Sequence, residues 1–166
     1  ITDNMFAMRR AVVPLMPRLM STVSQSAAGN SLLVTFATPN EVHYDNSSAV
    51  RQVDVPTVGS GEMGLLARHV PAIGVLKPGV VSFFETDGSV HKFFVSGGTV
   101  VMNADSSLQI LAEEAARVDD LDPEACRKQL SEWQARLDGA KDDAAKTEAR
   151  IALECAEAAA RASASE

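Results

Sequence analysis

Residues 61–80 read GEMGLLARHVPAIGVLKPGV, and residues 94–98 read FVSGG shortly after them. Glycine and proline recur through both stretches and separate short apolar runs, and a histidine, His69, stands just before Pro71. Glycine and proline are strong markers of turns, so a chain punctuated in this way folds back on itself repeatedly. The stretch therefore predicts short β-strands joined by tight turns.

The surrounding residues carry the same β pattern. Residues 50–55 alternate apolar and polar side chains, which is typical of a half-buried strand. Asp87-Gly88 separates two β-rich runs, 80–84 and 91–95, and predicts a hairpin. Further strands are expected over residues 32–36, 99–102 and 108–111. Because no helical pattern interrupts this series, we expect an all-β sandwich or flattened barrel over residues 31–116.

The composition changes after Glu113, where Ala, Glu, Asp, Lys and Arg dominate. Asp122 and Pro123 predict a helix start, because an acidic cap and a first-turn proline are both favoured there. An apolar stripe follows at helical spacing: Cys126, Leu130, Trp133 and Leu137. Gly139 is expected to end this helix by adopting the left-handed conformation.

A second helix is expected over about residues 142–162, antiparallel to the first. Its stripe is made mainly of small side chains: Ala145, Ala149, Ala152, Ala156 and Ala159. A hairpin of this kind over residues 117–166 has no core of its own, so it is expected to pack on the sandwich or on another subunit. The predicted class is therefore α+β, a β-sandwich followed by a two-helix hairpin.

Folding about residues 139–141 is expected to bring residues of the two helices together in pairs. Leu130 is expected to pack near Ile151, and Cys126 near Cys155. We expect the two cysteines to remain free thiols in a reducing compartment, because a disulfide needs Cα atoms within about 7 Å.

Length and charge narrow the classes of function. A chain of 166 residues is long enough for one domain with an appendage. Its formal net charge of -7 argues against a nucleic-acid-binding protein, which needs a basic surface. No apolar run approaches the roughly 20 residues that a membrane-spanning helix needs. Any association with a membrane is therefore expected to run through a partner.

The amino-terminal segment has a composition of its own. It carries three arginines among apolar residues, then several Ser and Thr, with no Asp or Glu between residues 5 and 40. This composition is typical of a mitochondrial transit peptide. We expect residues 1–20 to be such a leader, cleaved near Ser21, and residues 21–30 to be a linker. A disordered basic tail is the alternative, because two prolines interrupt a helix there.

No group of residues predicts catalysis. The glycines of residues 59–64 spell GxGxxG, but no helical pattern follows that would bind phosphate, so a tight loop between strands is expected. The histidines have no partners at metal-ligand spacing. His69 is expected to brace its loop through a hydrogen bond, and His91 to lie on the exposed face of a strand. Ser96 lacks the nucleophile-elbow pattern and marks a turn.

Four short motifs occur in the order and spacing of one known family: GEMGLL at 61–66, HVP at 69–71, LKPG at 76–79 and SGG at 96–98. Over about residues 31–162 the chain resembles the delta/epsilon family, the small central-stalk subunits of F-type ATP synthases. The subunit is called delta in mitochondria and epsilon in bacteria, and the expected leader favours the mitochondrial form. The resemblance implies a β-sandwich followed by two antiparallel helices.

The resemblance also implies a role. Such a subunit belongs to the rotor and has no catalytic site and no cofactor. It binds the foot of the gamma subunit and the polar loops of the c-ring, and in mitochondria it also holds the small epsilon subunit. It lies on the matrix side of the inner membrane and reaches the membrane only through the c-ring.

The resemblance places the contact with the c-ring and gamma on one loop: Glu62, Met63, Gly64, Leu65, Leu66 and His69. An exposed acid there suits Arg or Lys on the ring, because complementary charges fix the register of an interface. The apolar residues suit the centre of such an interface.

Two other functions stay open. Bacterial relatives bind ATP on the hairpin through an I/L-D-x-x-R-A motif. Residues 121–126 read LDPEAC, with Ala125 in place of the arginine and Cys126 in place of the alanine. One alternative is thus a regulatory subunit that binds ATP on its hairpin and inhibits hydrolysis. The loss of the arginine counts against it, because this cation would bind the phosphate. The third hypothesis, a sandwich enzyme or ligand-binding module, requires polar side chains that converge in a pocket.

Overall fold

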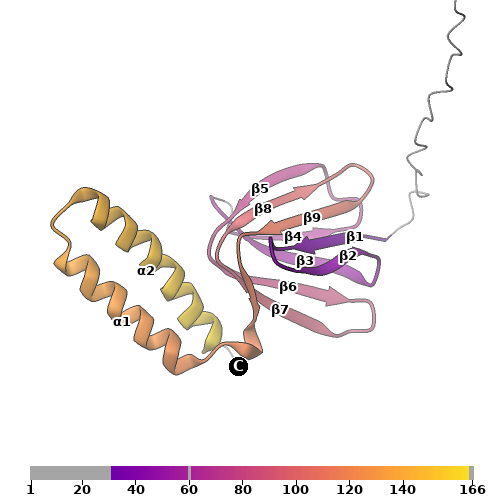
Figure 1. Cartoon of the computed structure of the whole chain (residues 1–166). Coiled ribbons are helices and arrows are strands. Elements are labelled where there is room, and N and C mark those ends of the chain that lie inside the picture. Colours follow the sequence, from indigo (N-terminus) through magenta and orange to yellow (C-terminus); the bar gives the residue numbers. More distant parts are fainter. Residues whose placement is uncertain (1–30, 60, 165–166) are drawn as a thin grey trace, which may run out of the picture.

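The structure is a computed structural model that describes residues 31–59 and 61–164. The predicted leader and linker, residues 1–30, lie outside the described residues. The described chain forms a β domain followed by a pair of helices (Figure 1). The strands are β1 (Leu33–Ala37), β2 (Val42–Ser47), β3 (Val50–Thr57), β4 (Gly61–Leu66), β5 (Ala72–Leu76), β6 (Gly79–Glu85), β7 (Val90–Val95), β8 (Gly98–Met102), β9 (Ser107–Ala112) and β10 (Ala115–Arg117). The helices are the short 3-10 helix η1 (Val118–Asp120), α1 (Pro123–Gly139) and α2 (Asp143–Ser163).

The strands form one sheet that curls over into a flattened sandwich, as the sequence predicts (Figure 1). Its order is β10-β7-β6-β3-β5-β8-β9-β1-β2, and β4 pairs with β3 outside this path. The long strand β3 joins the two halves, because most of it pairs with β6 while Thr57 at its end pairs with Leu76 of β5. β1 runs parallel to β9, and the remaining strand pairs are antiparallel.

Aromatic rings hold the two halves of the sheet together. Between ring centroids, Phe36 of β1 lies 5.2 Å from Phe83 of β6 and 5.3 Å from Phe93 of β7. Tyr44 of β2 stacks on Phe83 at 4.8 Å. Such contacts add to the stabilisation that burial of the rings provides. Aliphatic side chains fill the rest of this core, among them Leu32, Val34, Val53, Val55, Val81, Leu108 and Ile110.

The hairpin predicted at Asp87-Gly88 is confirmed, since β6 pairs with β7, and the strands expected over residues 99–102 and 108–111 pair with each other as β8 and β9. The residues 61–66, which we expected to form a loop, instead form strand β4. The turn before it is made by Gly59 at φ 88 and Gly61 at φ 76, which are conformations that glycine adopts without steric cost. Two strands, β2 and β10, are not apparent in the sequence. β2 is mostly polar and partly exposed, and β10 has only three residues.

Helix α1 begins as the sequence predicts, with Pro123 in its first turn and Asp122 as its cap. The Asp122 carboxylate accepts a hydrogen bond from the Glu124 N–H at 2.8 Å. The helix ends at Gly139 as predicted, but the predicted left-handed conformation is wrong, because Gly139 is not among the residues with positive φ. The chain leaves through Ala140 in an extended conformation, and the Ala140 N–H donates to the Leu137 carbonyl at 3.3 Å.

Helix α2 returns along α1, and its far end contacts β6 (Figure 1). The predicted alanine stripe is buried at Ala149, Ala156 and Ala159, but Ala145 is exposed. Ile151, which we expected to pack in the hairpin, is 66 % exposed. Ile151 follows the buried Ala149 by two positions, about 200° around the helix, so it lies on the outer side. Ala158 and Ala162 are also buried, where the end of α2 packs on β6. Neither described helix is long and apolar enough to cross a membrane.

Candidate functional site

Strand β4 carries most of the residues predicted to contact the c-ring and gamma. Successive side chains of a strand point to opposite faces, and the burial of β4 follows this alternation. Glu62 is exposed and Leu66 is 49 % exposed, whereas Leu65 is 1 % exposed and Met63 packs against the core. Glu62 and Leu66 are therefore available to a partner. Met63 and Leu65 stabilise the sandwich instead.

Gly64 makes room for an acidic side chain on the neighbouring strand. It pairs with Asp54 of β3, and a Cβ at position 64 would lie 3.1 Å from Asp54 Oδ1 and 3.6 Å from Gln52 Nε2. The Gln52 amide donates a hydrogen bond to Asp54 Oδ1 at 2.7 Å. The missing side chain therefore leaves space for this bonded pair, and Asp54 shares a shallow cavity with Glu62 and Lys77.

His69 lies beyond β4, in the turn that leads to β5. Its Nδ1 lies 2.8 Å from the Val70 carbonyl oxygen, which agrees with the expected bracing role. The backbone of the same turn is held by Arg68, at φ 63, whose N–H donates to Ser106 Oγ at 3.0 Å. This bond ties the turn to the connection between β8 and β9. His69 therefore stabilises the turn that follows β4, the strand that carries Glu62 and Leu66.

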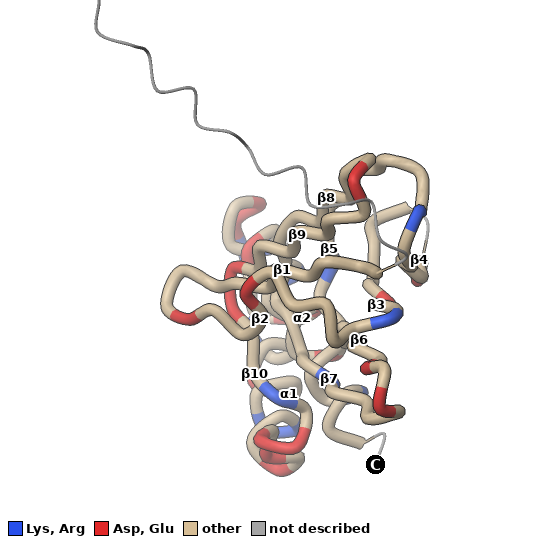
Figure 2. Tube along the Cα trace, turned by 90° about the vertical axis from the view of Figure 1, so that its right-hand side faces the viewer, with Lys and Arg blue, Asp and Glu red and all other residues tan. Residues whose placement is uncertain are grey.

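A second surface, which no motif in the sequence indicates, is the outer face of β5, β8, β9 and β1. Ile73 and Val75 are 79 % and 60 % exposed, and Leu111 is 59 % exposed. The strand register continues this face across the sheet from Ile73 to Val101 and from Val75 to Thr99 and Leu111. These four strands contain no charged residue, and their trace carries neither charge colour in Figure 2. The result is a broad, uncharged and partly apolar face.

The opposite outer face of the sandwich is covered. The end of α2 packs there against β6, with Ala158 and Ala162 buried. A cavity of about 440 Å³ remains beside this contact, lined by Ser82, Lys92 and other residues of both units. The two outer faces of the sandwich therefore differ, because one is closed by the hairpin and the other is open.

A cavity of about 480 Å³ separates the hairpin from β7 and β10. Phe94, Trp133 and both cysteines line it, together with the acids Glu114, Asp120 and Asp122, and its described lining includes no Lys or Arg. Burial raises the pKa of the Cys155 thiol, as do the carboxylates of Glu114 and Glu154. Such surroundings repel phosphate, and the Asp122 carboxylate is already bonded to the backbone of α1.

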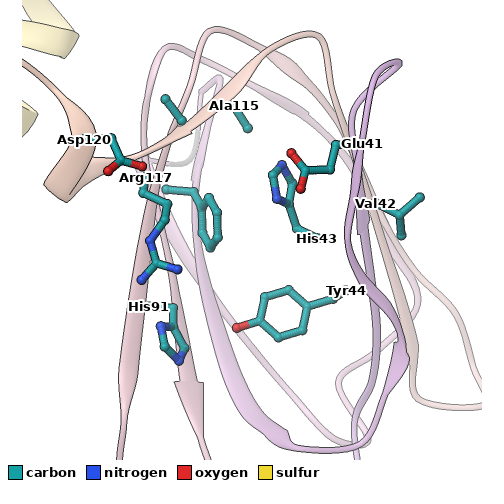
Figure 3. Close-up of a pocket in the computed structure, with 10 residues that line it drawn as sticks. Glu41, Val42, His43, Tyr44, His91, Ala115, Arg117 and Asp120 are labelled. Atoms are coloured by element: carbon teal, nitrogen blue, oxygen red, sulfur yellow. The ribbon is translucent and has the colours of Figure 1, made fainter.

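A cavity of about 580 Å³ opens where β2 faces β7 and β10 (Figure 3). His43 lies in it between two rings, 4.9 Å from Phe36 and 5.0 Å from Phe93. The Tyr44 hydroxyl donates to Glu85 Oε1 at 3.0 Å, and burial and this bond raise the pKa of Tyr44 to about 12.

His91 does not lie on a free strand face as expected. Its side chain is 35 % exposed at this cavity, with Nε2 3.6 Å from Glu85 Oε1. Glu85 thus receives the Tyr44 hydroxyl from the other layer and lies close to His91 on the neighbouring strand β7. Among the described residues, no three His, Cys, Asp or Glu side chains form a group that could hold a metal ion.

The hairpin residues predicted to pack are brought together except for Ile151. Cys126 is buried, and Leu130, Trp133, Leu137 and Cys155 are each half-buried. These residues lie on helices α1 and α2, whereas Glu62 and Leu66 lie on β4. The structure therefore separates the predicted contact residues from the predicted packing residues.

Known proteins are similar in sequence to this chain over most of its length. The family model for the β-sandwich domain of the ATP synthase delta/epsilon chain matches residues 31–118. The mitochondrial ATP synthase subunit delta of Caenorhabditis elegans is 47 % identical over 133 residues, which cover 80 % of each chain. The subunit of the same name from Yarrowia lipolytica is 38 % identical over 152 residues and 92 % of each chain.

Solved structures show the same fold. A chain of the Euglena gracilis mitochondrial ATP synthase, solved with OSCP, F1 and c-ring, aligns with a TM-score of 0.71 and 27 % identity, covering 78 % of this chain and 79 % of that chain. A chain of the central stalk and c-ring of the Tetrahymena thermophila enzyme aligns with a TM-score of 0.65 at 17 % identity, covering 80 % and 96 %. The chain therefore belongs to the ATP synthase delta/epsilon family, as a non-catalytic stalk subunit of the mitochondrial delta type.

Proposed function

We propose that this subunit couples rotation of the c-ring to the gamma subunit through two separate surfaces of one rigid sandwich. The observation that carries the proposal is the contrast between the polar edge at β4 and the uncharged face of β5, β8, β9 and β1. A joint that transmits torque needs firm contacts on both sides, and these two surfaces meet that need. Structural relatives come from ATP synthases solved with their stalk or c-ring, which supports the assignment.

The β4 edge is the proposed contact with the c-ring. Glu62 is exposed, so a basic group on the loops of the ring would find a complementary charge there. Leu66, at 49 % exposure, supplies apolar area at the end of the same strand. Together they give a contact whose register is fixed by charge and whose centre is apolar.

The uncharged face is the proposed contact with gamma. Exposed apolar patches of this kind mark protein interfaces, because their burial on association is favourable. Ile73, Val75 and Leu111 form the most exposed part of the face. Its size and its lack of charge suit a permanent neighbour within the rotor, rather than a transient one.

The mitochondrial epsilon subunit is the third proposed partner. The homologues place the chain in mitochondria. We place it further on the matrix side of the inner membrane, held there by the c-ring alone. The alternative function, an ATP-sensing hairpin, finds no support in the cavity beside α1, because Glu114, Asp120 and Asp122 line it where phosphate would need cations.

The proposal is tested by expressing tagged chain in mitochondria, purifying it after gentle solubilisation and identifying the subunits that co-purify. The unchanged chain is expected to recover gamma, c and epsilon. Glu62→Lys combined with Leu66→Asp is expected to reduce recovery of c while gamma remains. Ile73→Asp combined with Val75→Asp is expected to reduce the recovery of gamma.

Val90→Asp is the matched control, since Val90 is 45 % exposed at the far end of the β6–β7 hairpin. It should recover all three subunits. Equal recovery of gamma and c by every variant would reject the two proposed surfaces. A tagged chain that recovers no ATP synthase subunit would reject the function.

A further inference from the structure

The chain contains two cysteines, Cys126 and Cys155, and both line the cavity between the hairpin and the sandwich. Cys126 lies on α1 and is 8 % exposed, whereas Cys155 lies on α2 and is half-buried. Both are free thiols. Facing helices therefore direct their thiols toward one shared space, which has an opening to solvent through Cys155.

The two cysteines lie at the same height in the hairpin. Cys126 precedes the end of α1 at Gly139 by about 20 Å of helix, and Cys155 follows the start of α2 at Asp143 by about 18 Å, at 1.5 Å per residue. In an antiparallel pair, residues equally far from the turn lie opposite each other. The two cysteines therefore lie at corresponding positions on neighbouring helices, and both border the cavity beside the sandwich.

Small neighbours allow the two helices to approach closely at this height. Ala152 and Ala156 of α2 line the cavity beside the cysteines, and Ala156 is buried. Alanine at a helix contact permits short interaxial distances, toward the lower end of the 8–10 Å range. A disulfide needs Cα atoms about 5.5–6 Å apart, and helices whose axes lie within about 10 Å can bring Cα atoms this close, because each Cα lies about 2.3 Å from its own axis.

We propose that Cys126 and Cys155 form a dithiol that closes to a disulfide through reaction with a small-molecule disulfide such as oxidised glutathione, and that the bond locks α1 to α2. The inference concerns the hairpin and does not depend on the two contact surfaces proposed above. With the bond formed, the helices cannot separate. With the thiols reduced, the hairpin is held by packing alone.

The exchange proceeds in two steps that balance. The Cys155 thiolate, the more exposed of the two, attacks oxidised glutathione, forms a mixed disulfide and releases one glutathione. The Cys126 thiolate then attacks the Cys155 sulfur, forms the intramolecular bond and releases the second glutathione. The protein loses two electrons and two protons, and oxidised glutathione is reduced to two thiols.

The surroundings of Cys155 lower the reactivity of its thiol. Burial raises the pKa of its thiol, and so do Glu114, from the connection before β10, and Glu154, from α2. Asp120 and Asp122 add negative charge to the same cavity. Because the thiolate is the attacking species, these surroundings slow its reaction with oxidised glutathione as well as with oxygen or peroxide, so closure is expected to be slow.

The test uses the folded full chain, equilibrated in glutathione buffers of graded composition and then alkylated. Mass spectrometry should show both cysteines passing together from alkylated to protected, with a mass lower by two hydrogen atoms and no bound glutathione. The oxidised chain should melt about 5–10 °C above the reduced chain, since the new bond closes a loop of some 30 residues. Cys126→Ala and Cys155→Ala should each abolish both effects.

Alanine suits these positions because both cysteines lie within helices and alanine is a good helix former. Circular dichroism verifies that each variant is folded. Three results would overturn the proposal. One is a stable glutathione adduct on Cys155 without closure. Another is alkylation of both thiols under every buffer. The third is closure that occurs only after the chain is unfolded in urea.

Discussion

At the scale of single residues, two neighbours in β4 have different roles, since one packs in the core and the other lies at the surface. Leu65 is 1 % exposed and Leu66 is 49 % exposed, although both are leucines in the same motif. The sequence predicts that this motif contributes to an interface, but not which of its residues face the core, because it shows neither the pairing with β3 nor the side that is covered. The alternation of a strand resolves the point once the strand is known.

The different tasks predict different effects on stability. Leu65→Ala should lower the free energy of unfolding by about 3 kcal/mol, because it leaves a cavity in a packed core. Leu66→Ala should change it by less than about 0.5 kcal/mol. Urea unfolding followed by circular dichroism measures both values. Equal effects from the two changes would contradict the assignment of their faces.

Gly98 is the residue of the SGG motif that the fold cannot replace. Its φ is 149, and a Cβ there would lie 2.2 Å from the Leu111 carbonyl oxygen and 2.8 Å from the Ala112 Cα. Gly98→Ala should therefore destabilise the chain by more than about 3 kcal/mol, because backbone atoms would have to shift. Gly139→Ala is the control, since a Cβ there meets nothing within 4 Å. A folded, equally stable Gly98→Ala chain would disprove the close approach.

Tyr44 is the one tyrosine of the chain, so ultraviolet titration of tyrosinate reports on it alone. Its pKa in the folded chain is raised from 10.0 to about 12, by burial first and then by Glu85. The fold thus favours the neutral phenol. The stability it contributes is complete below pH 10 and is lost as the pH rises toward 12. Glu85→Gln should move the midpoint part of the way back to 10, and a midpoint of 10 in the unchanged chain would contradict the buried bond.

At the scale of elements, the sequence predicts those that have a strong local signal. The turn at Asp87-Gly88 and the cap at Asp122 both specify their elements locally, and both occur where expected. β2 and β10 escape prediction because edge strands that are polar or short have no apolar alternation. The prediction for Ile151 is wrong because Ile151 follows the buried Ala149 by two positions, about 200° around the helix, which turns it away from α1.

The cap of α1 gives a prediction for this element. Asp122→Ala removes the acceptor of the Glu124 N–H and should cost about 1 kcal/mol of stability. Trp133 is the one tryptophan and lies in α1, so its fluorescence follows the hairpin. Asp122→Asn should retain most of the stability, because asparagine also caps helices. An Asp122→Ala chain with an unchanged midpoint would show that the cap bond contributes nothing.

At the scale of the whole molecule, the hairpin leaves one face of the sandwich open. The sequence places Ile73 and Val75 within its signature stretch, yet it gives no reason to expect them at the surface. Their exposure depends on which face the helices cover, and that is decided by contacts between α2 and β6 that are far apart in the chain. Tertiary arrangement of this kind is not encoded in local periodicity.

The limited contact between the hairpin and the sandwich predicts that the two units unfold in a definite order. α2 contacts the sheet mainly through its last turns at β6, whereas the sandwich has a continuous core. The Trp133 fluorescence transition should therefore occur at lower urea than loss of the β signal in circular dichroism. Coincident transitions would show that the two units unfold as one, and that the contact at β6 is stronger than its area suggests.

The parallel pairing of β1 with β9 has a consequence for how the chain is made. Leu33 pairs with Ser107 and Ala37 with Leu111, so the first strand has no neighbour on that side until residues 107–111 have been synthesised. A pairing so distant in sequence closes slowly, because a large loop must be ordered first. During that interval the apolar side chains of β1 lie unprotected, and a nascent chain in this condition is a natural client for chaperones.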